Sequence, residues 1–329
     1  MATALNQAAL VETSNIAQME TNRKLGYLFA CCATVCWSGT GIFIDALTSH
    51  YPITPLELSF WRTLLVVGGL GLFLLRGGHT RRATNFRFGW REIPFYLVYG
   101  VIGVGVFNLT WSNSVAINKA AIATALLFCS PVFVVIGARW FFGERIRWPG
   151  FIAIALDLSG VFLVAGAFNV GALIDNFAGL VYAVGSGFTF AIYTLWGKMG
   201  ARAGIRSSTA ALFYTFLFAL CGLLGWGLVQ EGQQLFITHL DLNGWLLLTL
   251  LAFGPTLGGY AFFGLAIKHL EAGVISIFNT LEPPIAAVLA WLLLGRVLNW
   301  WQWLGAVLIV AGVLMLQSGG RIKFFRSNV

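Results

Sequence analysis

Long apolar segments alternate with short polar connections along almost the whole chain. Each segment is apolar over roughly 20 residues, the length of an α-helix that crosses the hydrocarbon core of a bilayer. Ten such segments occur: 26–46, 55–75, 93–114, 120–142, 149–168, 177–197, 208–229, 243–267, 271–294 and 300–317. No connection is long enough to hold a soluble domain. The pattern therefore predicts an all-α integral membrane protein with ten transmembrane helices.

Composition supports this prediction and excludes a soluble protein. Hydrophobic residues make up 58% of the 329 residues and charged residues 10%, against about 25% charged residues in soluble proteins. So little charge cannot solvate a surface of this size, and the apolar residues are spread over the whole chain. The five cysteines lie in apolar segments at spacings that match no metal or redox motif, so we interpret them as packing residues.

Lys and Arg residues fall almost entirely on one side of the predicted bundle. Of the 20, 17 lie in the tails and the even-numbered connections, whereas Lys119 and Arg296 lie on the opposite side and Arg62 lies inside a span. Positive residues mark the cytoplasmic side of a membrane protein. Both termini are therefore predicted to be cytoplasmic, with the chain in the inner cell membrane. The net charge of +8 is then a topology signal, and no nucleic-acid partner is expected.

The chain also repeats itself. Residues 121–163 align without a gap on 273–315, and the aligned pairs include Pro131/Pro283, Gly143/Gly295, Trp148/Trp300 and Gly160/Gly312. Farther upstream, GYLFA (26–30) resembles GLVYA (179–183), and Asn108 aligns with Tyr260. We therefore divide the chain into an N-terminal repeat, 1–168, and a C-terminal repeat, 169–329. Each repeat has five spans, an odd number, so the second is predicted to be inverted, as in many secondary transporters.

Three segments carry a resemblance to a known family. SPVFVVIGARWFFGERI (130–146), LEPPIAAVLAWLLLGRVL (281–298) and FWRTLL (60–65) are similar to signature segments of the drug/metabolite transporter superfamily, EamA type. The resemblance covers residues 25–317 and is greatest to the YddG group, which implies export of aromatic and other amino acids. Two positions depart from the family pattern, because Ser130 and Arg296 stand where many relatives have Glu.

The most unusual membrane segment is NTLEPPIAAV, residues 279–288, which places Glu282 before two prolines near the middle of span 9. Pro283 removes a backbone donor, so carbonyls near 278–280 lose their helical partners. Such backbone is tolerated in a membrane only where protein or water satisfies it, so this stretch should face the interior. Glu282 could bind a substrate ammonium group, carry a coupling proton, or hold helices together by hydrogen bonds. Ser130 at the matching position slightly favours the structural interpretation.

Other ionisable and helix-breaking residues inside the spans are expected to be structural or to take part in coupling. Arg62 lies in span 2, where an ion pair or a carbonyl anchor is favoured over binding of a substrate carboxylate. Asp157 in span 5 is expected to make a structural hydrogen bond, and Lys198 at the end of span 6 to act as a topology anchor. Pro131 and Pro283 are expected to interrupt their helices at equivalent positions.

Polar and aromatic side chains of spans 1, 3, 6, 8 and 9 are candidates to line a central cavity. An aromatic-lined cavity suits a planar or apolar side chain, with a few polar groups to orient the ends of a substrate. The candidate substrate-binding residues are Trp37, Tyr99, Asn108, Trp111, Ser186, Phe190, Tyr193, Tyr260, Ser276, Asn279 and Glu282.

The sequence contains none of the common catalytic or nucleotide-binding motifs. We therefore expect a non-enzyme without cofactor or metal, whose partners are the lipid bilayer and a small-molecule substrate, amino acids by resemblance. The predicted function is secondary transport by alternating access, with export of amino acids. The alternatives are a carrier of another small metabolite or drug-like compound, a channel, or a membrane enzyme. The sequence does not distinguish a monomer from a homodimer.

Overall fold

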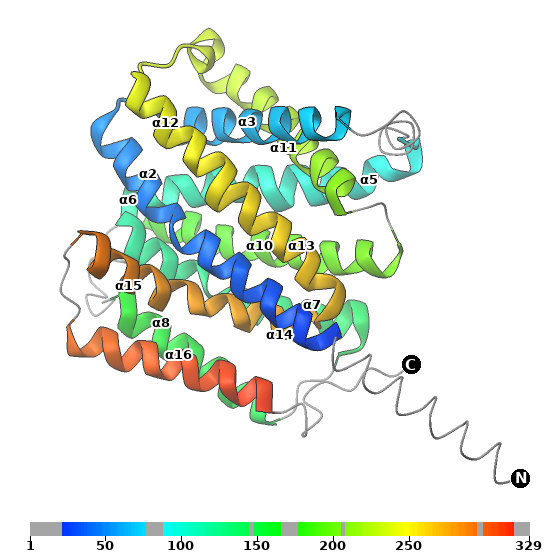
Figure 1. Cartoon of the computed structure of the whole chain (residues 1–329), viewed down its shortest axis with the longest axis vertical. Coiled ribbons are helices and arrows are strands. Elements are labelled where there is room, and N and C mark those ends of the chain that lie inside the picture. Colours follow the sequence, from blue (N-terminus) through cyan, green and yellow to red (C-terminus); the bar gives the residue numbers. More distant parts are fainter. Residues whose placement is uncertain are drawn as a thin grey trace, which may run out of the picture.

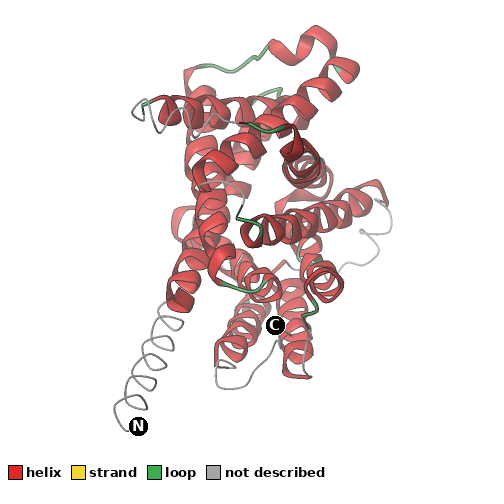
Figure 2. Cartoon of the chain, turned by 90° about the vertical axis from the view of Figure 1, so that its right-hand side faces the viewer, coloured by secondary structure: helices red, strands yellow, loops and turns green. Residues whose placement is uncertain are grey.

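The computed structural model describes residues 22–76, 88–144, 148–165, 177–204, 208–294 and 299–318. Within these ranges the chain is helical, with no β-strand (Figure 2). Seven of the described helices are long and apolar enough to cross a membrane: Asn22–His50, Pro55–Leu75, Trp90–Ile117, Phe177–Arg202, Thr209–Gln230, Leu242–His269 and Ala272–Leu289. Three shorter apolar helices accompany them: Ser130–Phe142, Gly150–Val164 and Trp300–Met315. The predicted boundary between the repeats, 168/169, lies outside the described residues.

Local structure divides several of these spans into shorter elements (Figure 1). Helical residues 22–38 lead into α2 in the first span. The elements that follow are α2 (Thr40–His50), α3 (Pro55–Leu75), η1 (Trp90–Glu92), α5 (Ile93–Tyr96), η2 (Leu97–Val106), α6 (Phe107–Leu127), α7 (Ser130–Phe142), α8 (Trp148–Ala165), α10 (Phe177–Arg202), α11 (Ser208–Gln230), η3 (Gly232–Phe236), α12 (Leu242–Leu251), η4 (Ala252–Gly258), α13 (Gly259–His269), α14 (Ala272–Phe278), η5 (Asn279–Leu281), α15 (Glu282–Leu294) and α16 (Trp300–Ser318).

The start of α3 is fixed by a capping box. Thr54 accepts a hydrogen bond from the Glu57 backbone N–H at 3.0 Å, and the Glu57 carboxylate accepts one from the Thr54 N–H at 2.8 Å. Pro55 occupies the first turn, where its missing N–H costs nothing. This cap sets the register of α3 and so the position of Arg62, two turns farther along.

The first span is interrupted at Gly39, where the sequence predicted a continuous helix over 26–46. The hydroxyl of Thr34 donates to the Ala30 carbonyl at 2.9 Å, and that of Ser38 donates to the Thr34 carbonyl at 2.6 Å. Hydroxyls that bond back to the preceding turn bend a helix, and Gly39 follows them directly as a turn residue. Span 1 therefore consists of two helical pieces that meet beside Trp37.

The fourth spans of the two repeats are broken at equivalent positions, as the prolines predicted. In the first repeat α6 ends at Leu127 and α7 begins at Ser130, one residue before Pro131. In the second repeat the 3-10 turn η5 separates α14 from α15, which begins at Glu282. The predicted connection between spans 3 and 4, at 115–119, is itself helical within α6, which corrects the sequence-based boundary.

The third spans contain π-helical segments that the sequence analysis did not predict. These segments, η2 and η4, end at Val106 and Gly258, which are equivalent positions of the two repeats 152 residues apart. Pro255 lies inside η4 and lacks the N–H that a regular turn would use. Because π-helical turns reorient the side chains that follow them, each segment redirects its span just before Asn108 or Tyr260.

Contacts between α8 and α16 follow the symmetry of the repeats. A Cβ on Gly160 would lie 2.6 Å from the Gly305 carbonyl oxygen, and one on Gly312 would lie 3.0 Å from the Ala153 carbonyl oxygen. Ala153 is the repeat equivalent of Gly305, and Gly160 of Gly312, so each contact is the image of the other. As residue numbers rise along α8 they fall along α16. The two helices therefore run antiparallel about a pseudo-twofold axis perpendicular to them.

A second pair of contacts obeys the same rule on other helices. A Cβ on Gly69 of α3 would lie 2.3 Å from the Phe253 ring, and one on Gly222 of α11 would lie 2.8 Å from Val101. Gly69 and Gly222 are equivalents, as are Val101 and Phe253. In each contact, a glycine in the second span of one repeat permits the close approach of the third span of the other repeat.

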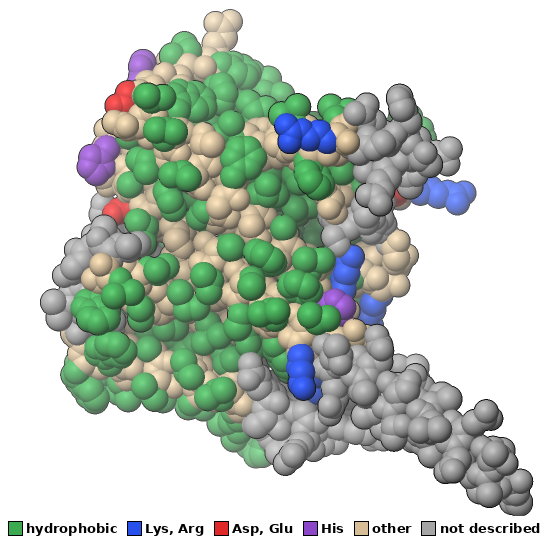
Figure 3. All heavy atoms as spheres, viewed as in Figure 1, with side chains coloured by type: hydrophobic (Ala, Val, Ile, Leu, Met, Phe, Trp, Pro, Cys, Tyr) green, Lys and Arg blue, Asp and Glu red, His purple; other side chains and the backbone are tan. Residues whose placement is uncertain are grey.

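The outer surface is that of a membrane protein. Hydrophobic side chains cover the middle of the face shown in Figure 3, and the Lys and Arg side chains of the described residues gather along its right-hand edge. The beginning of the first described helix and the end of α16 both lie toward that edge (Figure 1). The basic side chains are thus segregated to one end of the bundle.

Candidate functional site

A narrow cavity lies between the two repeats, near the centre of the bundle. It encloses about 40 Å³, room for one to a few water molecules. Helices of the first repeat contribute one wall, and α10, η4, α13, η5 and α15 contribute the other. The lining side chains are Trp37, Thr40, Arg62, Phe107, Asn108, Trp111, Leu127, Phe128, Phe190, Thr256, Tyr260, Asn279 and Glu282.

Several buried polar atoms of this lining have no hydrogen-bond partner among the residues that the structure describes. They are Thr40 Oγ1, Arg62 Nε and Nη2, Asn108 Nδ2, Thr256 Oγ1, Tyr260 OH and both polar atoms of the Asn279 amide. Buried polar groups in proteins are almost always satisfied by protein or water. So many unsatisfied donors and acceptors around one cavity indicate that they bind water or a ligand.

Arg62 is the cationic group of the cavity. It is 2% exposed, and no carboxylate within the described ranges lies within 4.0 Å of it, so the ion pair favoured by the sequence is absent there. Its Nε and Nη2 also reach no carbonyl among those residues. An arginine that is buried in this way without a fixed partner is free to bind an anionic group that enters the cavity.

Glu282 supplies the carboxyl group of the same cavity. It is the first residue of α15, where the partial positive charge of a helix N-terminus favours a carboxylate. The Tyr260 hydroxyl is close enough to interact electrostatically with both Arg62 and Glu282. The cavity therefore presents a guanidinium group, a carboxyl group and a phenolic hydroxyl.

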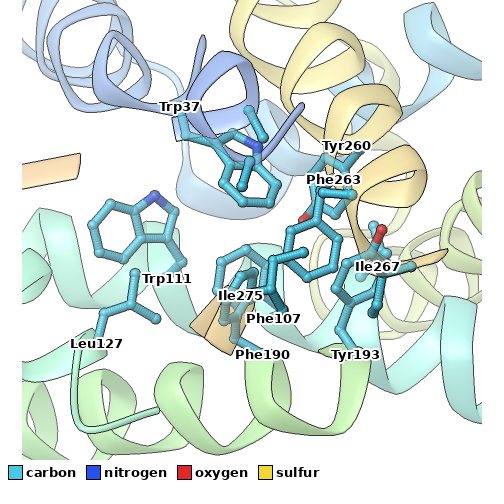
Figure 4. Packing of buried hydrophobic residues seen from close by; sticks show 14 of the residues in the cluster. Trp37, Phe107, Trp111, Leu127, Phe190, Tyr193, Tyr260, Phe263, Ile267 and Ile275 are labelled. Carbon is cyan, nitrogen blue, oxygen red and sulfur yellow. The ribbon is translucent and has the colours of Figure 1, made fainter. Parts of the chain in front are cut away.

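Aromatic rings form the apolar part of the site (Figure 4). The Trp37 ring meets Phe190 at 5.7 Å and Tyr260 at 5.4 Å between centroids, both edge to face. Trp111 and Leu127 lie on the opposite side of the view from Tyr260 and Phe263. Edge-to-face packing of this kind favours a fixed arrangement over a fluid one, so the rings define a shaped apolar wall.

A second and larger cavity, here called the vestibule, opens on the other side of Tyr260. It measures about 300 Å³. Tyr99 and Tyr193 stack at 4.7 Å with an interplanar angle of 5°, and Tyr193 meets Tyr260 edge to face at 5.2 Å. The vestibule is lined by Leu70, Phe73, Phe95, Tyr99, Tyr193, Gly197, Gly200, Ala201, Thr209, Ala211, Leu212, Leu257, Tyr260, Ala261, Gly264, Leu265, Ile267 and Lys268.

The structure groups most, but not all, of the residues that the sequence selected. Seven of the eleven candidates line the central cavity: Trp37, Asn108, Trp111, Phe190, Tyr260, Asn279 and Glu282. Tyr99 and Tyr193 line the vestibule. Ser186 and Ser276 are in neither lining. The Ser186 hydroxyl donates to the Ala183 carbonyl at 2.6 Å, a local bond that the sequence does not reveal.

The remaining predicted residues have structural positions. Asp157 lies at the contact of α8 with α16, where a Cβ on Gly312 would come within 2.6 Å of its Oδ1. Both of its carboxylate oxygens lack a hydrogen-bond partner among the described residues, so the structural hydrogen bond expected from the sequence is not found there. Pro131 is the second residue of α7, and Pro283 is buried at the start of α15. Cavity residues that the sequence analysis missed include Thr40 and Thr256. The one available signal for Thr256 is its place in GPTLG (254–258), whose glycine spacing is typical of close helix packing.

Lys198 is more than the topology anchor that the sequence suggested. It is buried, and its Nζ donates to the Ile267 carbonyl at 3.0 Å and to the Leu270 carbonyl at 2.5 Å. These carbonyls belong to the last turn of α13 and the residue after it, which lack helical partners. Lys198 therefore caps α13 from the neighbouring helix α10.

A small group of charges surrounds this cap at the basic end of the bundle. Glu144 pairs with Arg202 at 3.8 Å. Glu271, the residue before α14, is largely buried, and this burial, with the nearby Glu144 charge, raises the pKa of Glu271 to about 7. Burial likewise raises the pKa of Glu144. Glu271 therefore makes the basic end of the bundle sensitive to pH near neutrality.

These observations define an all-helical membrane protein with a polar and aromatic cavity between two related halves. Comparison with known families gives its membership. The model of the EamA-like transporter family matches twice, at residues 24–166 and 177–317, so the chain belongs to that family and is a membrane transporter. The double match corresponds to the two repeats.

Individual relatives agree with this membership. The chain is 27% identical to "Uncharacterized inner membrane transporter YicL" of Salmonella typhimurium, over 92% of this chain and 98% of that protein. It is 26% identical to "Probable amino-acid metabolite efflux pump" of the same organism, over 92% and 97%. It is 23% identical to "Riboflavin transporter" of Rhizobium johnstonii, over 92% and 94%.

A solved structure described as "Crystal structure of protein" shares the fold. The TM-score is 0.71 at 17% sequence identity, over 91% of this chain and 98% of the other. At this identity the likeness concerns the path of the backbone and not the residues of the site.

Proposed function

We propose that the protein is a secondary carrier that exports amino acids from the cytoplasm by alternating access. In this proposal ten transmembrane helices form two inverted repeats, 1–168 and 169–329, in the inner membrane with both termini cytoplasmic. The seven long and three shorter apolar helices supply the spans. The mirrored contacts Gly160–Gly305 and Gly312–Ala153 support the inversion, and the segregation of Lys and Arg supports the orientation.

One observation carries the choice of cargo: Arg62 and Glu282 line the same enclosed cavity, and the cavity is built from both repeats. An amino acid is a zwitterion. Its carboxylate matches the guanidinium of Arg62 and its ammonium group matches the carboxylate of Glu282. Binding would pair both charges at once, whereas a singly charged cargo would leave one buried charge unpaired, which is costly.

The aromatic wall adds a preference for the cargo's side chain. Trp37, Trp111 and Phe190 offer ring faces and edges to a planar or apolar group. Asn108, Asn279 and Tyr260 supply the neutral hydrogen-bonding groups. This combination is consistent with the proposed amino-acid export of the YddG type, and the relative described as an amino-acid metabolite efflux pump supports the proposal.

A second candidate is a carrier of another planar metabolite. The relative described as a riboflavin transporter favours it, and stacked Tyr99 and Tyr193 would suit a large ring system. Such a cargo would not need Arg62 and Glu282 together. The two candidates therefore differ in how transport responds to the loss of each charge.

Counterflow in proteoliposomes tests the proposal. Vesicles that contain purified protein and an excess of unlabelled amino acid should accumulate the same radiolabelled amino acid transiently and saturably. E282Q should reduce this accumulation strongly, and R139Q, which changes an exposed base on α7, should not. Flux that does not saturate would indicate a channel. Absence of counterflow for all amino acids, together with counterflow of a flavin, would support the second candidate.

A further inference from the structure

The two ends of the bundle are packed differently although the repeats make them equivalent. The vestibule opens at the end where Lys268 and Gly200 lie, which is the cytoplasmic end in the proposed topology. Inverted symmetry predicts a counterpart at the other end, lined by the equivalent residues of the opposite repeat. The state of that counterpart can be read from the burial of those residues.

The correspondence of positions is fixed by landmarks along the chain. The first two spans of each repeat are 153 residues apart, because α3 begins at Pro55 and α11 at Ser208. The third spans are 152 residues apart, because their π-helical segments end at Val106 and Gly258. The vestibule residues Gly197, Gly200, Ala211, Leu212, Gly264 and Ile267 then correspond to Ile44, Leu47, Leu58, Ser59, Ser112 and Val115.

All six counterparts are closed off. Ile44, Leu47, Leu58, Ser59, Ser112 and Val115 are each at most 3% exposed. Neither cavity described above includes any of them. Six of the vestibule residues thus border a cavity at the cytoplasmic end, whereas their counterparts at the outer end border neither of the two cavities.

One pair of residues shows the difference most directly. Ser59 and Ser112 are hydrogen-bonded through their hydroxyls at 3.1 Å, and the Ser59 hydroxyl also lies 3.3 Å from the Asn108 carbonyl oxygen. Their equivalents Leu212 and Gly264 both line the vestibule. A Cβ on Gly264 would meet nothing within 4 Å among the described residues.

Three hydrogen bonds join the repeats at the closed end. The Tyr51 hydroxyl donates to Asp241 Oδ1 at 2.6 Å, and the Thr54 hydroxyl donates to Glu231 Oε1 at 2.7 Å. The Trp61 indole N–H donates to the Leu235 carbonyl at 3.1 Å. Each bond links the first repeat to the second, so each would hold the outer end shut.

From these observations we infer that the structure is the cytoplasm-open state and that a second vestibule, closed here, forms at the outer end from Ile44, Leu47, Leu58, Ser59, Ser112 and Val115. The inference rests on the proposed alternating access and adds the residues of the release site. Opening separates Ser59 from Ser112 and frees the Ser112 hydroxyl, whereas the Ser59 hydroxyl still donates to the Pro55 carbonyl at 2.7 Å. The release site then offers hydroxyl groups to a small zwitterion or to water, whereas the equivalent positions on the cytoplasmic side offer Leu212 and Gly264.

Reactivity of introduced thiols tests the inference without any cargo. The variants S112C and L212C are made in a background in which the five native cysteines are replaced, and each is treated with a membrane-impermeant thiol reagent. We expect rapid labelling of L212C from the cytoplasmic side and slow labelling of S112C from the outer side. Adding Y51F removes the bond to Asp241 and should raise S112C labelling about threefold or more, with a smaller fall at L212C because the outer-open state is the minor one.

A lipid-side substitution provides the matched control. Y182F removes a hydroxyl from a tyrosine that is 37% exposed on α10 and should change neither rate. If addition of Y51F raised labelling at both S112C and L212C, the substitution would have destabilised the whole bundle, and the inference would be overturned. Failure of S112C to react in any background would also overturn it. A single monodisperse peak in size-exclusion chromatography of each variant shows that the protein is folded.

The outcome separates this inference from the proposed cargo. If labelling changed in opposite directions at S112C and L212C but no amino acid showed counterflow, the release site would be supported and amino acids would be rejected as the cargo. Saturable counterflow without reciprocal labelling would retain the carrier and reject these residues as the release site.

Discussion

Trp37 and Phe190 are equivalent residues of the two repeats, and their rings meet edge to face with centroids 5.7 Å apart. A residue that contacts its own equivalent lies on the symmetry axis that relates them. The neighbouring contacts are also exchanged, because Phe190 meets Phe107 at 5.4 Å and Trp37 packs against Gly259, the equivalent of Phe107. The central cavity thus lies where the two repeats meet. The contacts of Trp37 would change if either repeat moved relative to the other.

Substitution of Trp37 should therefore affect selectivity and stability to different extents. We expect W37F to preserve the fold and to weaken transport of an aromatic amino acid roughly two- to tenfold relative to an aliphatic one, because about 0.5–1.5 kcal/mol of ring contact is changed. We expect W37A to destabilise the protein by about 3–5 kcal/mol. Concentration dependence of counterflow and thermal unfolding in detergent measure the two effects. Equal losses for aromatic and aliphatic amino acids in W37F would contradict a ring-contact role.

Cargo analogues that lack either the carboxylate or the ammonium group should distinguish the roles of Arg62 and Glu282. R62Q is expected to lower transport of an amino acid by tenfold or more, because a buried charge pair that loses one partner costs about 3–5 kcal/mol. The same variant should affect the corresponding amine, which lacks the carboxylate, much less. Competition of each compound with labelled amino acid provides the measurement, and R62K serves as the variant that keeps the charge.

E282Q should show the reverse preference. Its effect is expected to be large for the amino acid and small for an analogue without the ammonium group. If both variants affected every analogue alike, Arg62 and Glu282 would be structural residues, as the sequence analysis favoured for each of them.

Much of the fold could be predicted from the sequence because it depends on strong, local signals. Apolar segments of about 20 residues specify membrane helices almost independently of their neighbours. Pro131 and Pro283 broke their helices where they were expected to, since a missing N–H acts within one turn. The glycines that the repeat alignment paired, Gly160 and Gly312, both lie in the contact of α8 with α16.

The features that the sequence analysis missed depend on which of several possible partners a side chain bonds and on how the helices pack against one another. The break at Gly39 needs the hydroxyls of Thr34 and Ser38 to bond back along the same helix, and these hydroxyls could equally have faced a neighbour. Lys198 sits at a span end, where lysine usually marks topology, and its role depends on the carbonyls of α13 beside it. Whether Arg62 meets an acid is decided by helix packing, which the depth of a residue in its span does not reveal.

The glycine contacts of α8 and α16 give a prediction on stability. G160V should destabilise the protein by about 1–3 kcal/mol, because a Cβ there would lie 2.6 Å from the Gly305 carbonyl oxygen and 2.7 Å from Ile309. Backbone atoms cannot move aside as a flexible side chain can. G185A is the control, since a Cβ at Gly185 meets nothing within 4 Å of the described residues. Thermal unfolding in detergent distinguishes them, and similar melting temperatures for both variants would contradict the close packing.

Glu271 gives a prediction on pH. Burial, with the nearby Glu144 charge, raises the pKa of Glu271 from 4.5 to about 7 in the folded state. Between pH 4.5 and 7 the folded protein therefore binds more protons at this site than the unfolded chain, so its contribution to stability falls as pH rises through that window. With about 1.4 kcal/mol for each pKa unit, the whole change is at most about 3 kcal/mol. The neighbouring charges of Arg23, Lys198 and Arg202 keep the pKa below the value that burial alone would give.

E271Q should remove this dependence. We expect the variant to be more stable than the parent at pH 8 and to lose less stability between pH 5.5 and pH 8, because an amide stays neutral throughout. Melting temperatures in detergent across this range provide the test, with D45N on α2 as the control. If E271Q and the parent changed in parallel from pH 5.5 to pH 8, the buried carboxylate would not be the group that titrates.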